Sequence, residues 1–221
     1  MQDRSAWRKE KRQSTEDRMD TLFAPIYDEN WGTEISPTHR HFIELFLGAC
    51  QPGASVLDAA CGTGKYWSML LSGGIHLTGI DQSLGMLQRS ISKYPLIPVK
   101  KLGLQEMQFM DEFDGITCVD AMEYVFPEDW PLVLENFYRA LKFPGILYFT
   151  VEIANSDEIE KSYRAGKDLG LPVLPGEWAH EEGYHYYPDM GQVRTWIDAA
   201  HFSILHEAVG DEYHHFLMQR A

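Results

Sequence analysis

Apolar and polar positions change their spacing several times along this chain of 221 residues. Residues 5–24 and 38–48 carry apolar side chains at helical spacing, whereas residues 27–37 are rich in aromatic and turn-forming residues and predict a loop. Short apolar runs then predict strands, with amphipathic helices between them. The strands are expected at residues 55–59, 76–80, 95–100, 114–119 and 145–152, and the helices at 64–72, 83–93 and 130–141. This alternation indicates a mostly parallel sheet with right-handed crossovers.

The last third of the chain departs from this alternation. Residues 153–188 contain scattered glycines and prolines and a run of tyrosines, and so long a segment inside a compact domain is typically a lid or binding element. Residues 189–200 predict a helix. Residues 202–207 and 213–218 predict two strands, and the short turn between them at Gly210 and Asp211 makes this pair antiparallel.

We therefore predict a single domain over residues 1–221. Within it, residues 1–45 are expected to form an N-terminal helical lid, and residues 153–188 an excursion on the substrate side.

Composition and charge narrow the class of protein. An apolar content of 44% and a charged content of 24% are ordinary for a globular domain. The N-terminus is polar, without a secretory signal, and no stretch approaches the roughly 20 apolar residues that span a bilayer. We therefore expect a cytoplasmic protein without a membrane partner, whose oligomeric state the sequence leaves open.

The charge balance argues against nucleic acid as a partner. The formal net charge is −14, and binding of phosphates needs a basic face. The one basic cluster, at residues 8–12, is interleaved with Glu10 and is interpreted as the solvated face of a helix. A small-molecule substrate fits this charge better. The three cysteines are odd in number and widely spaced, which predicts neither a disulfide framework nor a zinc site.

The segment at residues 58–64 (DAACGTG) joins a predicted strand to a predicted helix. Small residues there let the backbone approach a ligand, and a helix N-terminus presents free N–H groups. The segment matches neither G-x-G-x-x-G nor G-x-x-x-x-G-K-[ST], which disfavours both phosphate-binding fingerprints. Asp81 ends the next strand, where an acid can accept hydrogen bonds from both ribose hydroxyls. That feature suits NAD and S-adenosylmethionine (SAM) alike, so the choice of ligand depends on the loop.

The stretch VLDAACGTGKY, followed by GIDQSLGML, resembles the class I SAM-dependent methyltransferases. The resemblance extends from about residue 27 to the C-terminus and is tightest over residues 55–152. It implies an α/β fold with a doubly wound, Rossmann-like seven-stranded sheet, mostly parallel with an antiparallel last strand. It also implies S-adenosyl-L-methionine as the methyl donor and S-adenosyl-L-homocysteine (SAH) as the product.

The resemblance implies cofactor-binding roles for individual residues. Asp58 and the backbone of residues 60–62 would hold the methionine amino group, and Asp81 would hold the ribose hydroxyls. The full set is Asp58, Ala60, Cys61, Gly62, Gly64, Asp81, Gln82, Met86, Leu104, Gln105 and Asp120. The sequence departs from the family pattern twice. Ala60 stands where a glycine is frequent, and no acid follows the third strand to hold the adenine amino group, a role that then falls to Gln105 or a backbone carbonyl.

The acceptor side is predicted from two segments. Glu123 and Tyr124 lie in the loop after the fourth strand, which typically faces the substrate in this family, and His185 lies in the aromatic stretch GYHYYP. His185 is the first candidate for a catalytic base and Glu123 the second, the alternatives being a packed-loop histidine and a surface acid. Side chains expected to contact the substrate are Tyr27, Trp31, Tyr124, Tyr184, Tyr186 and His214. No metal site is predicted.

These features predict methyl transfer to a small-molecule acceptor by in-line displacement. Three alternatives stay open. The chain could be a catalytically silent SAM-binding subunit, a SAM-bound enzyme of isomerisation or cyclisation, or a nicotinamide oxidoreductase. The sequence leaves open whether oxygen, nitrogen, carbon or sulfur receives the methyl group.

Overall fold

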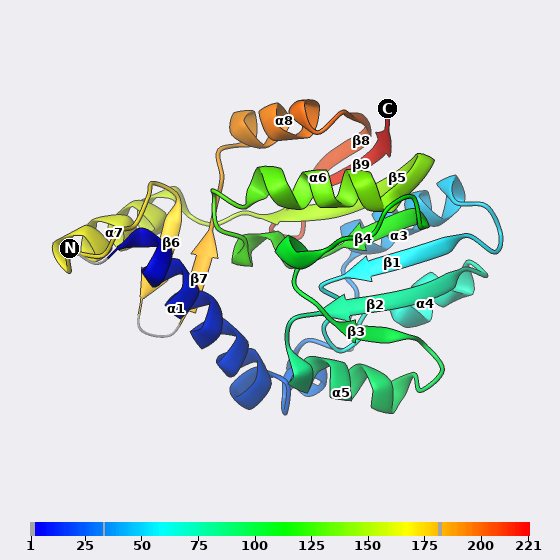
Figure 1. Cartoon of the computed structure of the whole chain (residues 1–221), viewed down its shortest axis with the longest axis horizontal. Helices are drawn as coiled ribbons and strands as arrows, with labels where there is room; N and C mark the ends of the chain where they lie inside the picture. Colours follow the sequence, from blue (N-terminus) through cyan, green and yellow to red (C-terminus); the bar gives the residue numbers. More distant parts are fainter. Residues whose placement is uncertain (1–2, 33, 181–182) are drawn as a thin grey trace.

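The computed structural model describes residues 3–32, 34–180 and 183–221, and a seven-stranded sheet forms its centre (Figure 1). Its strands are β1 (Ser55–Ala59), β2 (His76–Asp81), β3 (Val99–Lys101), β4 (Phe113–Cys118), β5 (Leu141–Glu152), β8 (Phe202–Gly210) and β9 (Tyr213–Arg220). Their order across the sheet is β3-β2-β1-β4-β5-β9-β8. Strands β1 to β5 pair in parallel, whereas β9 is antiparallel to both of its neighbours. The predicted doubly wound sheet with an antiparallel last strand is confirmed.

Helices cover both faces of the sheet. One face carries α3 (Pro37–Ala49), α4 (Trp67–Ser72) and α5 (Leu84–Lys93), and the other carries α6 (Trp130–Ala140) and α8 (Met190–Ala199). Successive residues of a strand point to opposite faces, so Val56 of β1 packs in the core cluster of α3 and α4, and Leu57 in that of α6. A strand buried on both faces is mostly apolar, and β1 is buried from Val56 to Ala59 with Asp58 as its polar exception.

The strand order reverses at β1, because β2 and β4 flank it on opposite sides. Such a switch point opens a crevice beyond the carboxyl ends of the strands. These ends face the side of the molecule where α1 (Arg4–Arg18) and the hairpin of β6 (Glu177–His180) and β7 (Gly183–Tyr186) lie (Figure 1). The start of β9 reaches the same edge, since Tyr213 pairs with Glu152 at the end of β5.

The N-terminal and excursion segments contain more structure than their patterns indicated. A five-residue π-helical turn, η1 (Met19–Phe23), extends α1, and a short helix α2 (Tyr27–Asn30) occupies part of the predicted loop. The excursion holds the hairpin and a further helix, α7 (Ser156–Asp168). The apolar positions of α7 are sparse, with Ile159, Tyr163 and Gly166 at helical spacing, and only Gly166 is buried. Two 3-10 turns, η2 (Leu104–Glu106) and η3 (Met122–Tyr124), follow β3 and β4.

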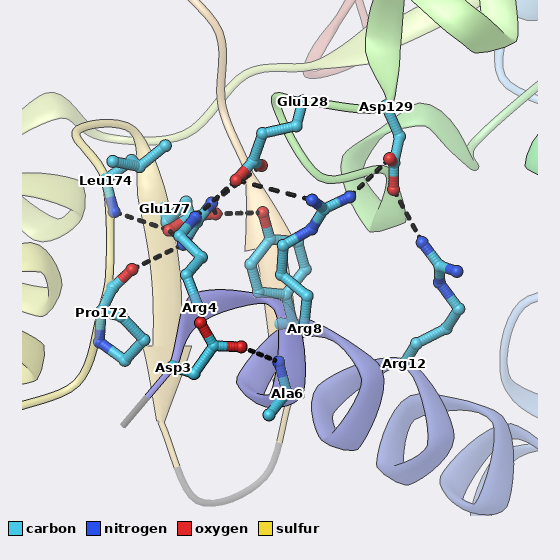
Figure 2. Close-up of polar contacts among 11 residues, drawn as sticks. Asp3, Arg4, Ala6, Arg8, Arg12, Glu128, Asp129, Pro172, Leu174 and Glu177 are labelled. Carbon is cyan, nitrogen blue, oxygen red and sulfur yellow. Dashed lines mark hydrogen bonds and ion pairs between the residues drawn. The ribbon is translucent and has the colours of Figure 1, made fainter. Parts of the chain in front are cut away.

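Three arginines on successive turns of α1 bind acids of the neighbouring elements (Figure 2). Arg4 donates two hydrogen bonds to Glu177 of β6, at 2.7 and 2.9 Å, and also binds Glu128. Arg8 and Arg12 both bind Asp129, just before α6. The interpretation of residues 8–12 as a solvated face was therefore wrong for these arginines. Their four-residue spacing aligns the three arginines on one side of α1, and their contacts hold this helix against the neighbouring elements.

Within the described ranges, no helix is both long enough and apolar enough to cross a membrane.

Candidate functional site

The loop after β1 carries three residues with positive φ, which are Ala60 (60°), Gly62 (53°) and Gly64 (76°). The amide of Gly62 donates to the Asp81 carboxylate at 2.8 Å, which ties the loop to the end of β2. A Cβ added to Gly62 would meet no atom within 4 Å, whereas one added to Gly64 would lie 2.8 Å from the Trp67 ring. Gly62 thus leaves room for a ligand, and Gly64 makes room for Trp67.

A cavity lies over this loop, and we call it the loop cavity. Ten of the eleven predicted cofactor-binding residues line it, namely Asp58, Ala60, Cys61, Gly62, Asp81, Gln82, Met86, Leu104, Gln105 and Asp120. Gly64 is not part of this lining. Arg12, Thr15 and Met19 close the cavity from α1 and η1, and no local pattern had marked them as ligand contacts. The fold therefore gathers positions from β1, β2, β4 and the N-terminal helix around one space.

Two buried carboxylates face the loop cavity. Asp58 accepts hydrogen bonds from Trp67 Nε1 and Thr117 Oγ1, both at 2.7 Å, and Asp81 accepts from the amides of Gly62 and Ser83. Burial raises the pKa of each to about 6, although these hydrogen bonds act in the opposite direction. Among the described residues neither carboxylate forms an ion pair, so an ammonium group or hydroxyls of a ligand would satisfy them.

Asp120 lies just past β4, in the lining of two cavities. Its carboxylate binds His39 Nε2 at 2.8 Å and Tyr66 Oη at 2.6 Å, and Lys65 Nζ lies 3.9 Å away. Burial alone would raise the pKa of Asp120, but the hydrogen bonds and charges of these neighbours hold it below its ordinary value. Its φ of 53° is unusual for a residue other than glycine, a strain that often marks functional sites.

The second cavity, which we call the lid cavity, has a volume of about 560 Å³. It lies between η1, α2, η3, the end of β5, the hairpin and the start of β9. Six predicted acceptor-side residues line it, namely Tyr27, Trp31, Glu123, Tyr124, Tyr184 and His185. Other lining residues that the sequence had not marked include Glu152, Trp178 and Tyr213. Glu152 could have been found, because it ends β5 at the same edge as Asp81 and Asp120.

The two predicted base candidates have different surroundings. His185 directs Nδ1 toward Tyr187 Oη (2.9 Å) and Glu152 Oε2 (3.1 Å), and its ring packs edge-on against Tyr124. Glu123 is 4% exposed, and its Oε2 atom has no hydrogen-bond partner in the part of the chain that the structure describes. Burial, followed by the charge of Glu152, raises the pKa of Glu123 well above its ordinary value. No cluster of three or more potential metal ligands occurs among the described residues.

Two predicted substrate contacts lie elsewhere. Tyr186 packs in the core against Trp130, and His214 stacks on Phe216. On β9 strand alternation is the reason, because Tyr213 faces the cavity and His214 points to the other face. On β7, Tyr184 and Tyr186 share the face that packs in the core, and of these two only Tyr184 also reaches the cavity lining. The prediction of Tyr186 and His214 as substrate contacts is therefore corrected.

The chain is similar in sequence to known methyltransferases. Residues 56–145 match the model of a family described as a methyltransferase domain. The chain is 33% identical over 141 residues to YqeM of Bacillus subtilis, whose name describes it as a candidate methyltransferase; the match covers 58% of this chain and 53% of that protein. It is 27% identical over 195 residues to the ubiquinone biosynthesis O-methyltransferase of Histophilus somni, covering 80% of this chain and 74% of that one.

The solved structure of magnesium protoporphyrin IX methyltransferase from Synechocystis, with bound SAH, superposes with a TM-score of 0.70. Its sequence is 14% identical, and the superposition covers 96% of this chain and all of that one. At this identity the likeness concerns the fold. The chain spans between about half and three quarters of the length of the two curated relatives named above.

Proposed function

This chain belongs to the class I SAM-dependent methyltransferases, and we propose that it transfers a methyl group from SAM to a small-molecule acceptor in the lid cavity. The observation that carries this proposal is the junction of the two cavities. Both are lined by the same six residues, which are Thr15, Met19, Tyr27, Lys65, Asp120 and Tyr124. A methyl donor held over the loop would meet an acceptor in the lid cavity at these residues.

The loop cavity suits the parts of SAM. The open Cβ position of Gly62 leaves space for the close approach of a ligand to the backbone. We assign the ribose hydroxyls to Asp81 and the methionine ammonium to Asp58, because both are buried carboxylates without a cation among the described residues. Met86 and Leu104 supply apolar surface for the adenine, and Gln105 its polar edge.

Methyl transfer from a sulfonium needs alignment, exclusion of water and removal of a proton from the acceptor. Alignment follows from two cavities that meet at one junction. Residues of α1 and of the β6–β7 hairpin line the cavities at this junction, and the contact of Arg4 with Glu177 in Figure 2 joins these two elements. For the proton, the wall of the lid cavity offers Glu123 and His185.

A small-molecule acceptor agrees with the volume of the lid cavity, because 560 Å³ lies within the usual range of small-ligand sites, about 300–1,000 Å³. Two of the similar proteins are named for ubiquinone biosynthesis and for magnesium protoporphyrin IX. The formal charge of −14 also disfavours a nucleic-acid substrate.

Calorimetric titration with SAM, followed by incubation with a pool of small metabolites and mass analysis, tests the proposal. We expect SAM to bind and an acceptor to gain one methyl group. Glu123→Gln and His185→Gln identify the residue that accepts the proton. Turnover should fall by about a hundredfold in the variant that lacks this residue, with SAM affinity nearly unchanged. SAM binding without transfer to any acceptor would favour a silent subunit, and a product without an added methyl would favour another reaction. Failure to bind SAM or SAH would overturn the proposal.

A further inference from the structure

Glu123 is an unusual member of the lid cavity wall. It follows β4 in the turn η3, is 4% exposed, and its Oε2 atom has no hydrogen-bond partner among the described residues. A buried carboxylate normally has its oxygens satisfied by hydrogen bonds or a cation. Since Glu123 lines the cavity, a ligand in that cavity can supply the missing partner.

The other acids of the lining differ in their partners. Asp120 is bound by His39 and Tyr66, whereas Glu152 Oε2 has no hydrogen-bond partner among the described residues, although His185 Nδ1 lies 3.1 Å away. The fourth acid is Asp211, in the turn before β9, and it accepts a hydrogen bond from the backbone amide of Thr38. Among the described residues, Glu123 and Glu152 are therefore the two carboxylates of this wall with an oxygen that lacks a hydrogen bond, and Glu123 is the more deeply buried of the two.

The lysine and the arginine of the lining contact residues other than Glu123. Lys65 lies 3.9 Å from Asp120, and Arg18 packs over the Phe23 ring at 5.3 Å. The charges that act most on Glu123 are those of Glu152 and Asp120, and both are negative. A ligand that enters between these acids thus meets a negative field with little compensation from protein cations.

Aromatic rings form most of the remaining wall. They come from four separate parts of the chain, and they are Phe23, Tyr27, Trp31, Tyr124, Trp178, Tyr184 and Tyr213. The face of an aromatic ring carries negative charge and attracts cations, more strongly when water is excluded. Aromatic walls around an unsatisfied carboxylate are a combination that suits an organic ammonium group.

We propose that the acceptor is a basic amine, that its ammonium group binds Glu123 within this aromatic wall, and that the reaction is N-methylation. This inference rests on the proposed function and names its substrate class. A phenolate or carboxylate acceptor would add a negative charge beside Glu123 and Glu152, which is unfavourable. A neutral alcohol would form one hydrogen bond but would supply no counter-ion, so it would not favour the charged form of a carboxyl whose pKa is raised by burial.

The proposed N-methylation needs only the ammonium group, the Glu123 carboxylate and SAM. The ammonium group passes one proton to the Glu123 carboxylate and becomes a neutral amine. The nitrogen lone pair then attacks the methyl carbon of SAM, so that a C–N bond forms, the S–C bond breaks and its electrons stay on sulfur. The products are SAH and a methylated ammonium ion. The proton on Glu123 leaves to water when the product departs.

The test compares two probes of the same shape, phenethylamine and 2-phenylethanol, by calorimetric titration of the full chain with and without SAH. We expect the amine to bind at least about tenfold more tightly than the alcohol. In Glu123→Gln this preference should fall to about threefold or less, because the isosteric amide keeps the hydrogen bond and removes the charge. Glu152→Gln should reduce it less. Glu135→Gln, an exposed position on α6, removes the same charge outside the cavity and should leave the preference unchanged.

The outcomes separate the two proposals. Equal affinity of the two probes, binding of neither, or a preference that survives in Glu123→Gln would overturn the amine inference even if SAH binds and an acceptor gains a methyl group. Loss of SAH binding in the wild type would overturn the proposed function, while the amine preference would still be measured on the free protein. The SAH affinity of each variant reports whether its fold is retained, and Glu152→Gln provides the second variant if Glu123→Gln does not fold.

Discussion

The contact of Arg4 with Glu177 provides a test of how α1 is held over the crevice. The Glu177 side chain is completely buried, and Arg4 donates to it at 2.7 and 2.9 Å (Figure 2). Replacing Arg4 with Met keeps an unbranched, largely apolar stem and removes the guanidinium group with its charge. Glu177 would then keep two neutral donors, Tyr184 Oη and the amide of Leu174, both at 2.7 Å.

The expected loss follows from this arrangement. Removing one partner of a buried ion pair costs about 3–5 kcal/mol, because the remaining charge lacks compensation. The Arg4 side chain is 20% exposed and Glu177 retains two hydrogen bonds, so we expect a value near the lower limit, about 3 kcal/mol. Since α1 and η1 also supply Arg12, Thr15 and Met19 to the loop cavity, SAM affinity should fall together with stability.

Urea unfolding of the purified protein measures the first effect, and calorimetric titration with SAM the second. The matched control is Arg164→Met, which removes an exposed pair with Glu160 on α7 and should cost at most about 0.5 kcal/mol. Adding Glu177→Gln to Arg4→Met removes the isolated charge and should recover much of the loss. If Arg4→Met unfolds at the same urea concentration as Arg164→Met and binds SAM like the wild type, the docking role of Arg4 is refuted.

Three further predictions concern the loop cavity. Gly62→Ala and Gly53→Ala both place a Cβ at positive φ with no atom within 4 Å, so each should cost about 1–2 kcal/mol in urea unfolding. Gly62 lines the loop cavity and Gly53 does not, so only Gly62→Ala should lose SAM affinity by tenfold or more in titrations. Equal SAM affinities of the two variants would contradict the assignment of Gly62 to the ligand site. Gly64→Ala should lose more stability than either, because its Cβ would lie 2.8 Å from the Trp67 ring; a loss no larger than that of Gly53→Ala would contradict this. Because the pKa of Asp81 is raised to about 6, its carboxylate is protonated at lower pH, so SAM affinity should rise between pH 5 and 7, and this rise should be smaller in Asp81→Asn. Affinities that are constant over that range would contradict the assignment of Asp81.

Local patterns were sufficient for most of the central sheet. The predicted strand at residues 55–59 is β1, and the predicted turn at Gly210 lies at the end of β8. These features depend on neighbours in the chain, namely the apolar runs of buried strands and the turn residues between them. The parallel order then brings the carboxyl ends of β1, β2 and β4 to one edge, which is why Asp58, Asp81 and Asp120 could be assigned together.

The acceptor side depended on contacts between distant segments. His39 binds Asp120 across 81 positions of the chain, and Arg4 binds Glu177 across 173. No spacing rule connects such pairs, because their geometry exists only after the helices dock. In the same way, the sequence placed Tyr186 and His214 near the site, but the packing of β7 and β9 determines which of their side chains meet the cavity.

The sequence by itself therefore determined the sheet, the loop after β1 and the family. Periodicity, turn residues and the resemblance of one contiguous stretch are local properties of the sequence, so they can be recognised without knowledge of the fold. Only the tertiary structure decided that Glu123 is buried without a full set of partners, that Glu152 and Tyr213 join it, and that α1 closes the crevice. The burial of a side chain and the charges around it depend on segments that are distant in the sequence and come together only in the folded structure.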